Sequence, residues 1–393
     1  MIAISQKKNP FSFETILEST RDIAHEVVAI ETIKVDRDAC WPEQGIRAMQ
    51  AAGLGGLVVP KAKGGLGQGL LALTQVCEIL GGECASTALC FGMHSVGTAV
   101  LAAKATPYQQ ERYVEPICQG KHLTTLALSE PGSGAHFYLP QCQLTVESPA
   151  MFRVNGQKSF ITNGGYADSY VISTTAADAN AVGEFSCAMI SNGAEGLIWG
   201  KPWAGLGMRG NSSCSAELRN VPVPRQDLLG AEGDQIWYVF NVVAPYFLVA
   251  MAGTYLGVAS AALEEARIHL SKRYYTHSGS TLGQTPVMQH RLGTLWSVVE
   301  RTRRLIYYAA TEADSGGPNT LAALCSAKAE VADCAVNVVN EVMTITGGIN
   351  YRDGSKLERL LRDARAAHVM SPTTDILRTW AGRALLGLPL LGD

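Results

Sequence analysis

The stretches that decide the fold are LALSEPGSG, Leu126–Gly134, and FITNGG, Phe160–Gly165. Each begins as a β-like run and ends in turn residues, so each leaves backbone N–H groups and a hydroxyl, Ser129 or Thr162, at the end of a strand. Such donors can hold a flat, electron-rich ring, and the glycines of the first stretch let the backbone approach a phosphate closely. The two stretches are therefore candidates for a ligand site, with ordinary surface turns as the alternative.

Other short stretches surround these two in a definite order. They are AGLGGLVVP at 52–60, GGLG at 64–67, GLGMRG at 205–210, VPVP at 221–224, GG at 347–348 and LLRDAR at 360–365. Taken together, the order and the sequences resemble the acyl-CoA dehydrogenase family over nearly the whole chain. The resemblance implies an α+β fold with an N-terminal helical domain, a central β-domain and a C-terminal four-helix bundle.

Composition sets the outer bounds of the interpretation. At 393 residues the chain exceeds one ordinary core and suggests two or three packed modules, and 47% hydrophobic residues are enough for a large interior. A formal net charge of −3 produces no field that would gather nucleic acid or an anionic membrane. We therefore expect neither as a partner.

The cysteines and the first residues predict a compartment. The sequence has 10 cysteines and no CxxC pair, and several fall on apolar faces, so reduced buried thiols are expected rather than a disulfide framework or a zinc site. Met1–Phe13 has lysines but no continuous apolar segment of the kind that directs secretion. These features predict a cytoplasmic protein without a metal.

Gln235–Leu263 is the one segment to weigh as a membrane span. It carries no charged residue and is long enough to cross a bilayer. However, it contains Pro245 and Asn241, and its helical pattern continues into charged residues. A buried helix of a large α-domain is therefore the expected structure, and no membrane span is predicted.

Periodicity divides the chain into three parts. Residues 1–122 have helical spacing of apolar positions, 123–234 contain strand-length apolar runs, and 235–393 are helical again. Asn155-Gly156, between the runs 151–154 and 158–161, predicts a hairpin turn. Pro286 predicts the start of a helix that ends at Asp314. The following helix carries, at helical spacing, Leu321, Leu324, Lys328, Val331, Ala335, Val338 and Val342.

The resemblance also implies FAD as cofactor and assigns residues to it. Leu128 and Ser129 match positions that contact the flavin ring, and Phe160 and Thr162 match an aromatic residue and a threonine on its other side. The remaining positions implied to bind the cofactor are Ser133 and Gly134 in a phosphate-proximal loop, Arg273, and the pair Gly347 and Gly348.

Several positions depart from the family pattern. Ala135-His136 stands where Ser-Asp usually follows the glycine loop, and Thr344 occupies the Gln place of Gln-x-x-Gly-Gly. Arg273 is the nearest match to an arginine often supplied to a neighbouring subunit's flavin, but its spacing to Gln289 is longer. Leu248 stands near the place of an arginine that serves the thioester-bearing cofactor. The carrier of the acyl group, CoA or a carrier protein, therefore stays open.

The catalytic base is the largest departure. Family dehydrogenases remove an α-proton from a thioester with a glutamate, which must be ionised and within hydrogen-bond reach. An ungapped alignment on Arg362–Arg365 places Ser371 at the usual position of this glutamate, and an alignment on Leu256-Gly257 places Phe247 at the position used by other members. His368 and Asp375 lie close to Ser371 in sequence and are the substitute bases that we consider.

These observations predict an FAD-dependent oxidoreductase that introduces an α,β double bond into an acyl thioester, with an electron acceptor as partner and a homotetramer or homodimer as assembly. Two alternatives follow from the missing glutamate. One is a flavin-dependent monooxygenase of the same fold, which needs a flavin reductase and no α-proton base. The other is a non-catalytic subunit that completes a partner's flavin site.

Overall fold

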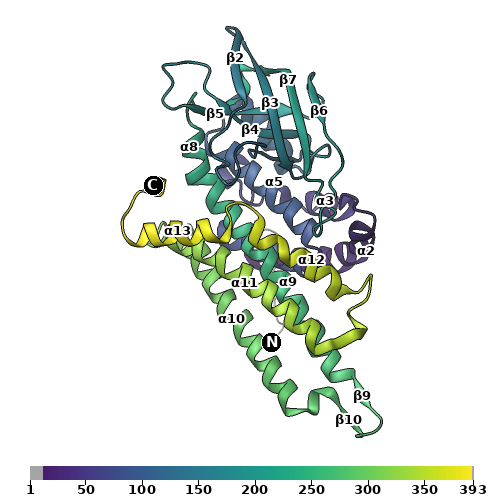
Figure 1. Ribbon diagram of the computed structural model, residues 1–393. Helices are drawn as coiled ribbons and strands as arrows, with labels where there is room; N and C mark the ends of the chain where they lie inside the picture. Colours follow the sequence, from purple (N-terminus) through teal and green to yellow (C-terminus); the bar gives the residue numbers. More distant parts are fainter. Residues whose placement is uncertain (1–11, 392–393) are drawn as a thin grey trace, which may run out of the picture.

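Helices form both ends of the chain and strands form its middle (Figure 1). The structure is a computed structural model, which describes residues 12–391. The N-terminal helices are α1 (Phe13–Ile23), α2 (Ala29–Arg37), α3 (Glu43–Ala51), α4 (Leu70–Glu83), α5 (Ala85–Ala103), α6 (Pro107–Gln109) and α7 (Glu115–Cys118). Of these, α5 is buried along almost its whole length because it lies between the other helices and the first strand.

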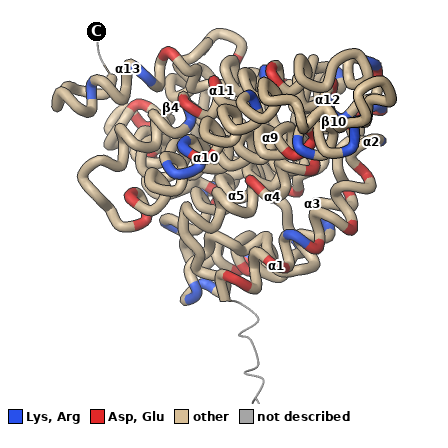
Figure 2. Tube along the Cα trace, turned by 90° about the horizontal axis from the view of Figure 1, so that it is seen from below, with Lys and Arg blue, Asp and Glu red and all other residues tan. Residues whose placement is uncertain are grey.

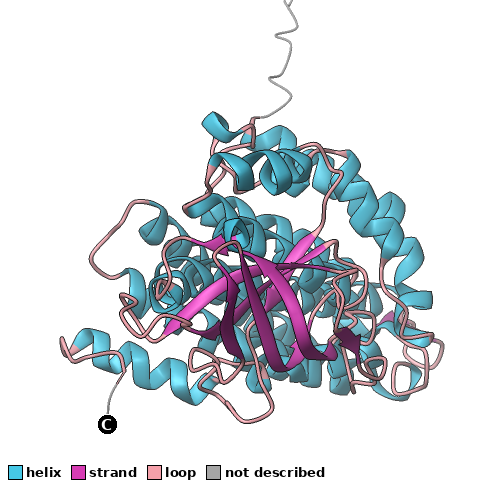
Figure 3. Cartoon of the chain, turned by 90° about the horizontal axis from the view of Figure 1, so that it is seen from above, coloured by secondary structure: helices cyan, strands magenta, loops and turns pink. Residues whose placement is uncertain are grey.

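The central part contains two four-stranded sheets, which Figure 3 shows from above with helices around and behind them. One sheet has the order β1-β4-β5-β8 and the other the order β2-β3-β7-β6. The strands are β1 (Thr124–Ala127), β2 (Gln143–Ser148), β3 (Met151–Ile161), β4 (Ser169–Thr175), β5 (Phe185–Ser191), β6 (Leu197–Trp199), β7 (Cys214–Pro224) and β8 (Leu228–Leu229). Only the β1–β4 pair is parallel among the strand pairs within residues 12–391.

The predicted hairpin turn at Asn155-Gly156 is wrong, because both residues lie inside β3. The Asn155 side chain pairs with Asn220 of β7, donating to Oδ1 at 2.9 Å and accepting from the backbone N–H at 2.8 Å. Gly156 has a φ of 148° at a register shift, and a Cβ there would lie 2.5 Å from Sγ of Cys142. The glycine therefore serves a bulge and a close approach between strands, not a turn.

The C-terminal part is helical, as predicted. It comprises α8 (Gln235–Tyr238), α9 (Ala244–Lys272), the short strands β9 (Tyr274–Tyr275) and β10 (Ser280–Thr281), α10 (Pro286–Asp314), α11 (Thr320–Thr346), α12 (Lys356–Val369) and α13 (Thr374–Leu385). Helices α9, α10 and α11 pack side by side, and α12 and α13 pack on α11. The bounds of α10 agree with those predicted from Pro286 and Asp314.

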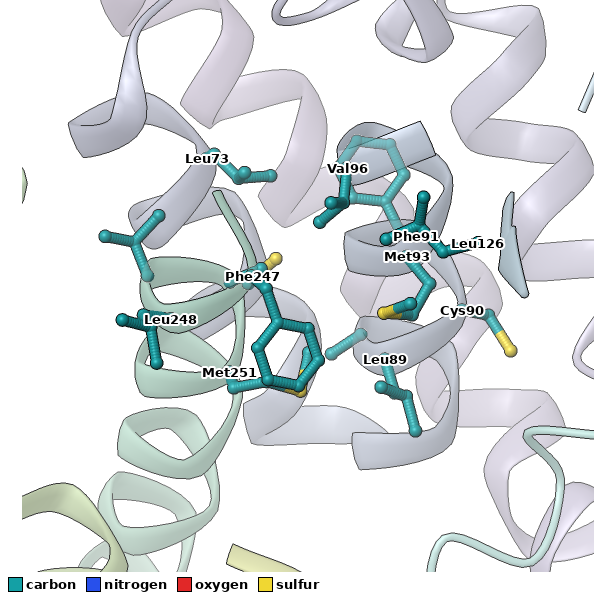
Figure 4. Close-up of a cluster of buried hydrophobic side chains, with 14 of the residues drawn as sticks. Leu73, Leu89, Cys90, Phe91, Met93, Val96, Leu126, Phe247, Leu248 and Met251 are labelled. Atoms are coloured by element: carbon teal, nitrogen blue, oxygen red, sulfur yellow. The ribbon is translucent and has the colours of Figure 1, made fainter. Parts of the chain in front are cut away.

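Helices α4 and α9 join the two helical parts at a close crossing. A Cβ on Gly81 would lie 2.4 Å from the Thr254 carbonyl oxygen, and one on Gly253 would lie 2.2 Å from the Thr74 carbonyl oxygen. Only glycine allows the two backbones to approach this closely. The crossing fixes the start of α9, where Phe247 and Met251 enter the apolar cluster shown in Figure 4.

Two helical segments are long and apolar enough to cross a membrane by length and composition, α5 and Gln235–Lys272. Their most apolar windows are 100% and 78% buried within the protein. The prediction of a buried helix for Gln235–Leu263 is therefore confirmed. Figure 2 shows lysine and arginine positions interspersed with aspartate and glutamate positions along the Cα trace.

Candidate active site

The stretches Leu126–Gly134 and Phe160–Gly165 meet at one cavity of about 70 Å³. The cavity lies where the end of β1, the end of β3, the start of α9 and the α12–α13 turn come together. Its lining consists of Met93, Leu126, Leu128, Ser129, Phe137, Phe160, Val243, Ala244, Phe247, Ser371 and Pro372. The backbone N–H of Ser159, the residue directly before the second stretch, donates to the Ser129 carbonyl oxygen at 2.8 Å and so holds the two stretches side by side.

A free hydroxyl and a fixed backbone characterise the first stretch. The Ser129 hydroxyl has no hydrogen-bond partner within residues 12–391. Next to it, the Glu130 carboxylate accepts from Lys158 Nζ at 2.6 Å and from the Gln141 N–H at 2.7 Å. Burial raises the pKa of Glu130, but the Lys158 ammonium outweighs it and holds the pKa below its usual value. The backbone is therefore fixed while the Ser129 hydroxyl is available to a ligand.

The glycine loop after Ser129 is a tight turn with an open side. The Ser133 hydroxyl donates to the Glu130 carbonyl oxygen at 3.1 Å and accepts from the Glu130 N–H at 3.3 Å. Gly134 has a φ of +52°, and a Cβ there would meet no atom within 4 Å. A backbone that is free of side chains in this way suits close approach by a phosphate.

The second stretch presents an aromatic ring. Phe160 has a φ of +53° at a register break in β3 and is 68% exposed. The Trp203 ring lies edge-on to it, with ring centroids 6.3 Å apart. The Thr162 hydroxyl lies 3.3 Å from that of Ser213. An exposed ring held in a strained backbone conformation favours a functional role. The ring, the hydroxyls and the open glycine loop together fit a flat cofactor with a phosphate.

Both positions at which the resemblance expects an acid line this same cavity. Ser371 reaches it from the α12–α13 turn, and Phe247 reaches it from α9. Figure 4 shows the Phe247 ring between α9 and α5, with Leu89 and Met93 on the α5 side. Among the described residues that line the cavity, none is an acid, a histidine or a lysine. The cavity therefore has hydroxyls but no ordinary proton acceptor.

The two substitute bases do not line the cavity. His368 lies near the end of α12, where its Nε2 is 2.9 Å from Oδ1 of Asp333 on α11. Asp375 is exposed in the first turn of α13, where a negative charge is favourable at the helix N-terminus. The assignment of either residue as the base stays a prediction from the sequence.

Three further predicted cofactor residues lie elsewhere in the chain. Arg273 directly follows α9, and its guanidinium stands over the Tyr275 ring at 5.3 Å. The β9–β10 hairpin, which begins directly after Arg273, lies at the end of the helical part that is remote from the two four-stranded sheets (Figure 1). Gly347 and Gly348 follow α11, and a Cβ on either would meet no atom within 4 Å. None of the three lines the cavity in this chain.

Sequence reasoning missed two buried lysines near the cavity. Lys158 forms the ion pair with Glu130, and Lys328 on α11 donates to backbone carbonyls of the α12–α13 turn. A signal for Lys328 was present, since it is the one charged residue within an apolar helical stripe. Its partners were not visible because they lie on another helix.

Comparison with known proteins gives matches to one family along the chain. The acyl-CoA dehydrogenase N-terminal, middle and C-terminal domain models match residues 12–121, 125–221 and 246–386. The chain is 29% identical over 373 residues to the cyclohex-1-ene-1-carbonyl-CoA dehydrogenase of Geobacter metallireducens, covering 94% of this chain and 97% of the relative. It is also 29% identical to an acyl-CoA dehydrogenase of Bacillus subtilis, covering 93% of this chain and 96% of the relative.

Solved structures confirm the fold. Butyryl-CoA dehydrogenase from Megasphaera elsdenii superimposes with a TM-score of 0.89 at 24% identity, over 98% of this chain and 100% of that one. The prolyl acyl carrier protein oxidase AnaB superimposes with a TM-score of 0.84 at 23% identity, over 96% and 99%. Consecutive domain matches, full-length relatives and the shared fold agree: the protein belongs to the acyl-CoA dehydrogenase family of FAD-dependent oxidoreductases, which act on the CH–CH bond of acyl thioesters.

Proposed function

We propose that this protein oxidises the α,β CH–CH bond of an acyl thioester at the cavity lined by Ser129, Phe160 and Ser371. One observation supports the proposal: residues of both stretches that resemble flavin-binding sequences line that cavity. Phe247 and Ser371, the two positions where the resemblance expects an acid, line it as well. Bound FAD would supply the acceptor for the β-hydride. Phe247, Met93 and Phe137 give the cavity an apolar lining, which suits the hydrocarbon part of an acyl group.

The cofactor contacts are part of the proposal. The Ser129 and Thr162 hydroxyls would hydrogen-bond the polar edge of the flavin ring, Leu128 and Phe160 would pack on it, and the turn at Ser133 and Gly134 would lie against the phosphates. Hydroxyls and backbone N–H groups at strand ends are suited to these contacts.

Arg273, Gly347 and Gly348 are remote from the cavity, so we propose that they serve the cofactor of a second copy. This role requires a homodimer or homotetramer. The free state of all ten cysteines supports a reducing compartment, and the cytoplasm is the proposed location.

Removal of the α-proton is the step for which the cavity lining provides no strong proton acceptor among the described residues. A serine hydroxyl at position 371 is a far weaker proton acceptor than a carboxylate, and a positioned base contributes about 10²- to 10⁴-fold to rate. His368 and Asp375 would have to move with the α12–α13 turn to supply the base. The lining therefore favours acyl groups whose α-proton is already acidified by a neighbouring unsaturated group.

The absence of an ionisable group from the described lining also supports a second function. A flavin-dependent monooxygenase of this fold removes no α-proton and needs oxygen and a flavin reductase. A non-catalytic subunit of a heteromeric dehydrogenase would bind no flavin alone and would copurify with a partner that carries the glutamate.

The test is an anaerobic titration of the purified, flavin-containing protein. CoA and acyl carrier protein thioesters of increasing chain length, with and without β,γ-unsaturation, are added while the absorbance of oxidised flavin is followed. Bleaching by a thioester supports the dehydrogenase and identifies the carrier. If flavin is bound and no thioester bleaches it, the dehydrogenase proposal fails, and oxygen-dependent product formation with a reductase then tests the monooxygenase. Purification without flavin would favour the subunit.

A further inference from the structure

Lys328 is a buried cation that the proposed chemistry does not use. It lies on α11 with 0% of its residue surface exposed. Among the ion pairs of residues 12–391, none includes Lys328. A buried ammonium without a carboxylate is costly unless hydrogen bonds satisfy all its protons. Its presence inside an apolar helical stripe therefore requires an explanation.

The hydrogen bonds of Lys328 give that explanation. Its Nζ donates to the backbone carbonyl oxygens of Ala367 at 2.8 Å, Met370 at 2.9 Å and Pro372 at 3.0 Å. An ammonium has three N–H donors, so each is used once. Ala367 lies in the last turn of α12, where carbonyls lack a partner within the helix and a positive charge is favourable.

Two of these carbonyls flank the residue that matters for the cavity. Met370 and Pro372 are the immediate neighbours of Ser371, whose side chain lines the cavity beside Ser129 and Phe160. Lys328 therefore holds the backbone on both sides of position 371. Burial lowers the pKa of Lys328 to about 7, while three carbonyl acceptors favour the charged form that the arrangement needs.

A second group on α11 holds the helices on either side of this turn. Asp333 accepts from Arg378 of α13 and is hydrogen-bonded to His368 of α12. Lys328 and Asp333 together tie α12, the turn and α13 to a single long helix. The partners of Asp333 lie on α12 and α13, so Asp333 can stabilise the packing of these helices. Lys328 in addition binds two carbonyl oxygens of the turn between them.

We propose that Lys328 is a positioning residue that holds the side chain at position 371 toward the reacting cavity. The inference rests on the proposed function, because the position matters to chemistry only if the thioester reacts at that cavity. A displacement of about 1 Å in a reacting group can cost about 100-fold in rate. The ammonium would thus act on rate through the residue at 371, without touching the substrate.

The test uses a carboxylate installed at position 371, so that the position has a measurable rate. Ser371→Glu is combined with Lys328→Met, which has no donors, and with Lys328→Gln, which keeps two N–H donors on a shorter side chain. Val342→Ala, on the same helix and fully buried, is the matched control for loss of packing. Anaerobic stopped-flow measures the limiting rate of flavin reduction and the thioester Kd separately.

We expect Lys328→Met to lower the limiting rate of the Ser371→Glu protein by about 10- to 100-fold with the thioester Kd within about twofold. Lys328→Gln should lie between, and Val342→Ala should leave the rate unchanged at a comparable loss in Tm. If Lys328→Met does not fold, the intermediate rate expected of Lys328→Gln decides the question. An unchanged rate in the folded Lys328 variants would overturn the proposal, as would an equal loss in Val342→Ala.

Hydrogen–deuterium exchange separates failure of this inference from failure of the proposed function. The amides of Met370, Ser371, Thr373 and Thr374 should exchange at least 10-fold faster in Lys328→Met than in the unaltered protein, while Val342→Ala should leave them unchanged. This readout needs no substrate. If no thioester reduces the flavin of any variant, the proposed function fails, while faster exchange still supports the clamp and unchanged exchange overturns it.

Discussion

Phe247 of α9 and Ser371 of the α12–α13 turn line the same cavity from different walls (Figure 4 shows Phe247). The sequence alignment identified them separately, as the two places where an acid would be expected. A carboxylate at either place would therefore border the same cavity. In this chain one place holds a hydroxyl and the other an aromatic ring.

Ser371→Glu should therefore increase the rate of flavin reduction by a CoA or carrier protein thioester. A positioned base contributes about 10²- to 10⁴-fold, and an apolar lining favours a base whose pKa lies near neutral pH. The measurement is the limiting rate of flavin bleaching in anaerobic stopped-flow. Ser371→Gln has the same shape without the charge and should show no gain. An equal rate in both variants would place the reacting bond elsewhere.

Ser129→Ala and Thr162→Ala should each weaken flavin binding by about 2- to 10-fold, since a net hydrogen bond is worth about 0.5–1.5 kcal/mol. Titration of the apoprotein with FAD gives the Kd. Thr145→Ala, at an exposed position of β2, is the control because its hydroxyl donates to the Arg153 carbonyl oxygen at 3.3 Å and lies outside the proposed cofactor contacts. Equal Kd values for Ser129→Ala and the control would remove Ser129 from the flavin site.

His368→Gln and Asp375→Asn test the substitute bases. Because His368 is bound to Asp333 and Asp375 is exposed, we expect the rate of flavin reduction to change less than twofold. The Tm of His368→Gln should fall, since the contact with Asp333 weakens. A loss of 10²-fold or more in the rate of either variant would instead assign that residue as the base, and would require the α12–α13 turn to rearrange on binding.

Glu130→Gln should lower the free energy of unfolding by about 3–5 kcal/mol, because it leaves the buried Lys158 ammonium without its carboxylate. Urea unfolding followed by tryptophan fluorescence measures the change. Glu217→Gln, whose partner is the exposed Arg219, should have little effect. A small change in Glu130→Gln would mean that the carbonyl contacts of Lys158 suffice to hold its charge.

His94 should make the protein acid-sensitive. Its Nδ1 is 3.2 Å from both the backbone nitrogen and the carbonyl oxygen of Thr124, and its Nε2 is 3.1 Å from the Gly55 carbonyl oxygen. The neutral tautomer with the proton on Nε2 accepts from the Thr124 N–H and donates to Gly55. Burial lowers the pKa of His94 from 6.5 to about 4. The unfolded chain therefore binds a proton that the folded protein does not, so stability falls as pH decreases from 6.5 to 4, by about 3 kcal/mol.

His94→Gln removes this titration and keeps a donor and an acceptor. Its unfolding free energy should decrease less steeply than that of the unaltered protein between pH 6.5 and 4, as measured by urea unfolding at a series of pH values. Parallel pH profiles would show that other groups cause the acid sensitivity.

Much of the architecture followed from the sequence alone. The order helical–β–helical, the bounds of α10 and the burial of Gln235–Leu263 are local properties, since periodicity, prolines and charge are read along one segment. The stretches Leu126–Gly134 and Phe160–Gly165, which resemble flavin-binding sequences, could also be found in the sequence because each is a continuous run of residues.

Only the tertiary structure decided how distant segments meet. Asn155-Gly156 has the composition of a turn, yet pairing with Asn220 and the close approach of Cys142 place it inside a strand. The carbonyl partners of Lys328 and the carboxylate partner of His368 lie on other elements. Contacts of this kind depend on packing between segments far apart in the chain, which local composition does not encode. The sequence thus determined that Phe247 and Ser371 stand where the resemblance expects an acid, and the tertiary structure decided that both line one cavity.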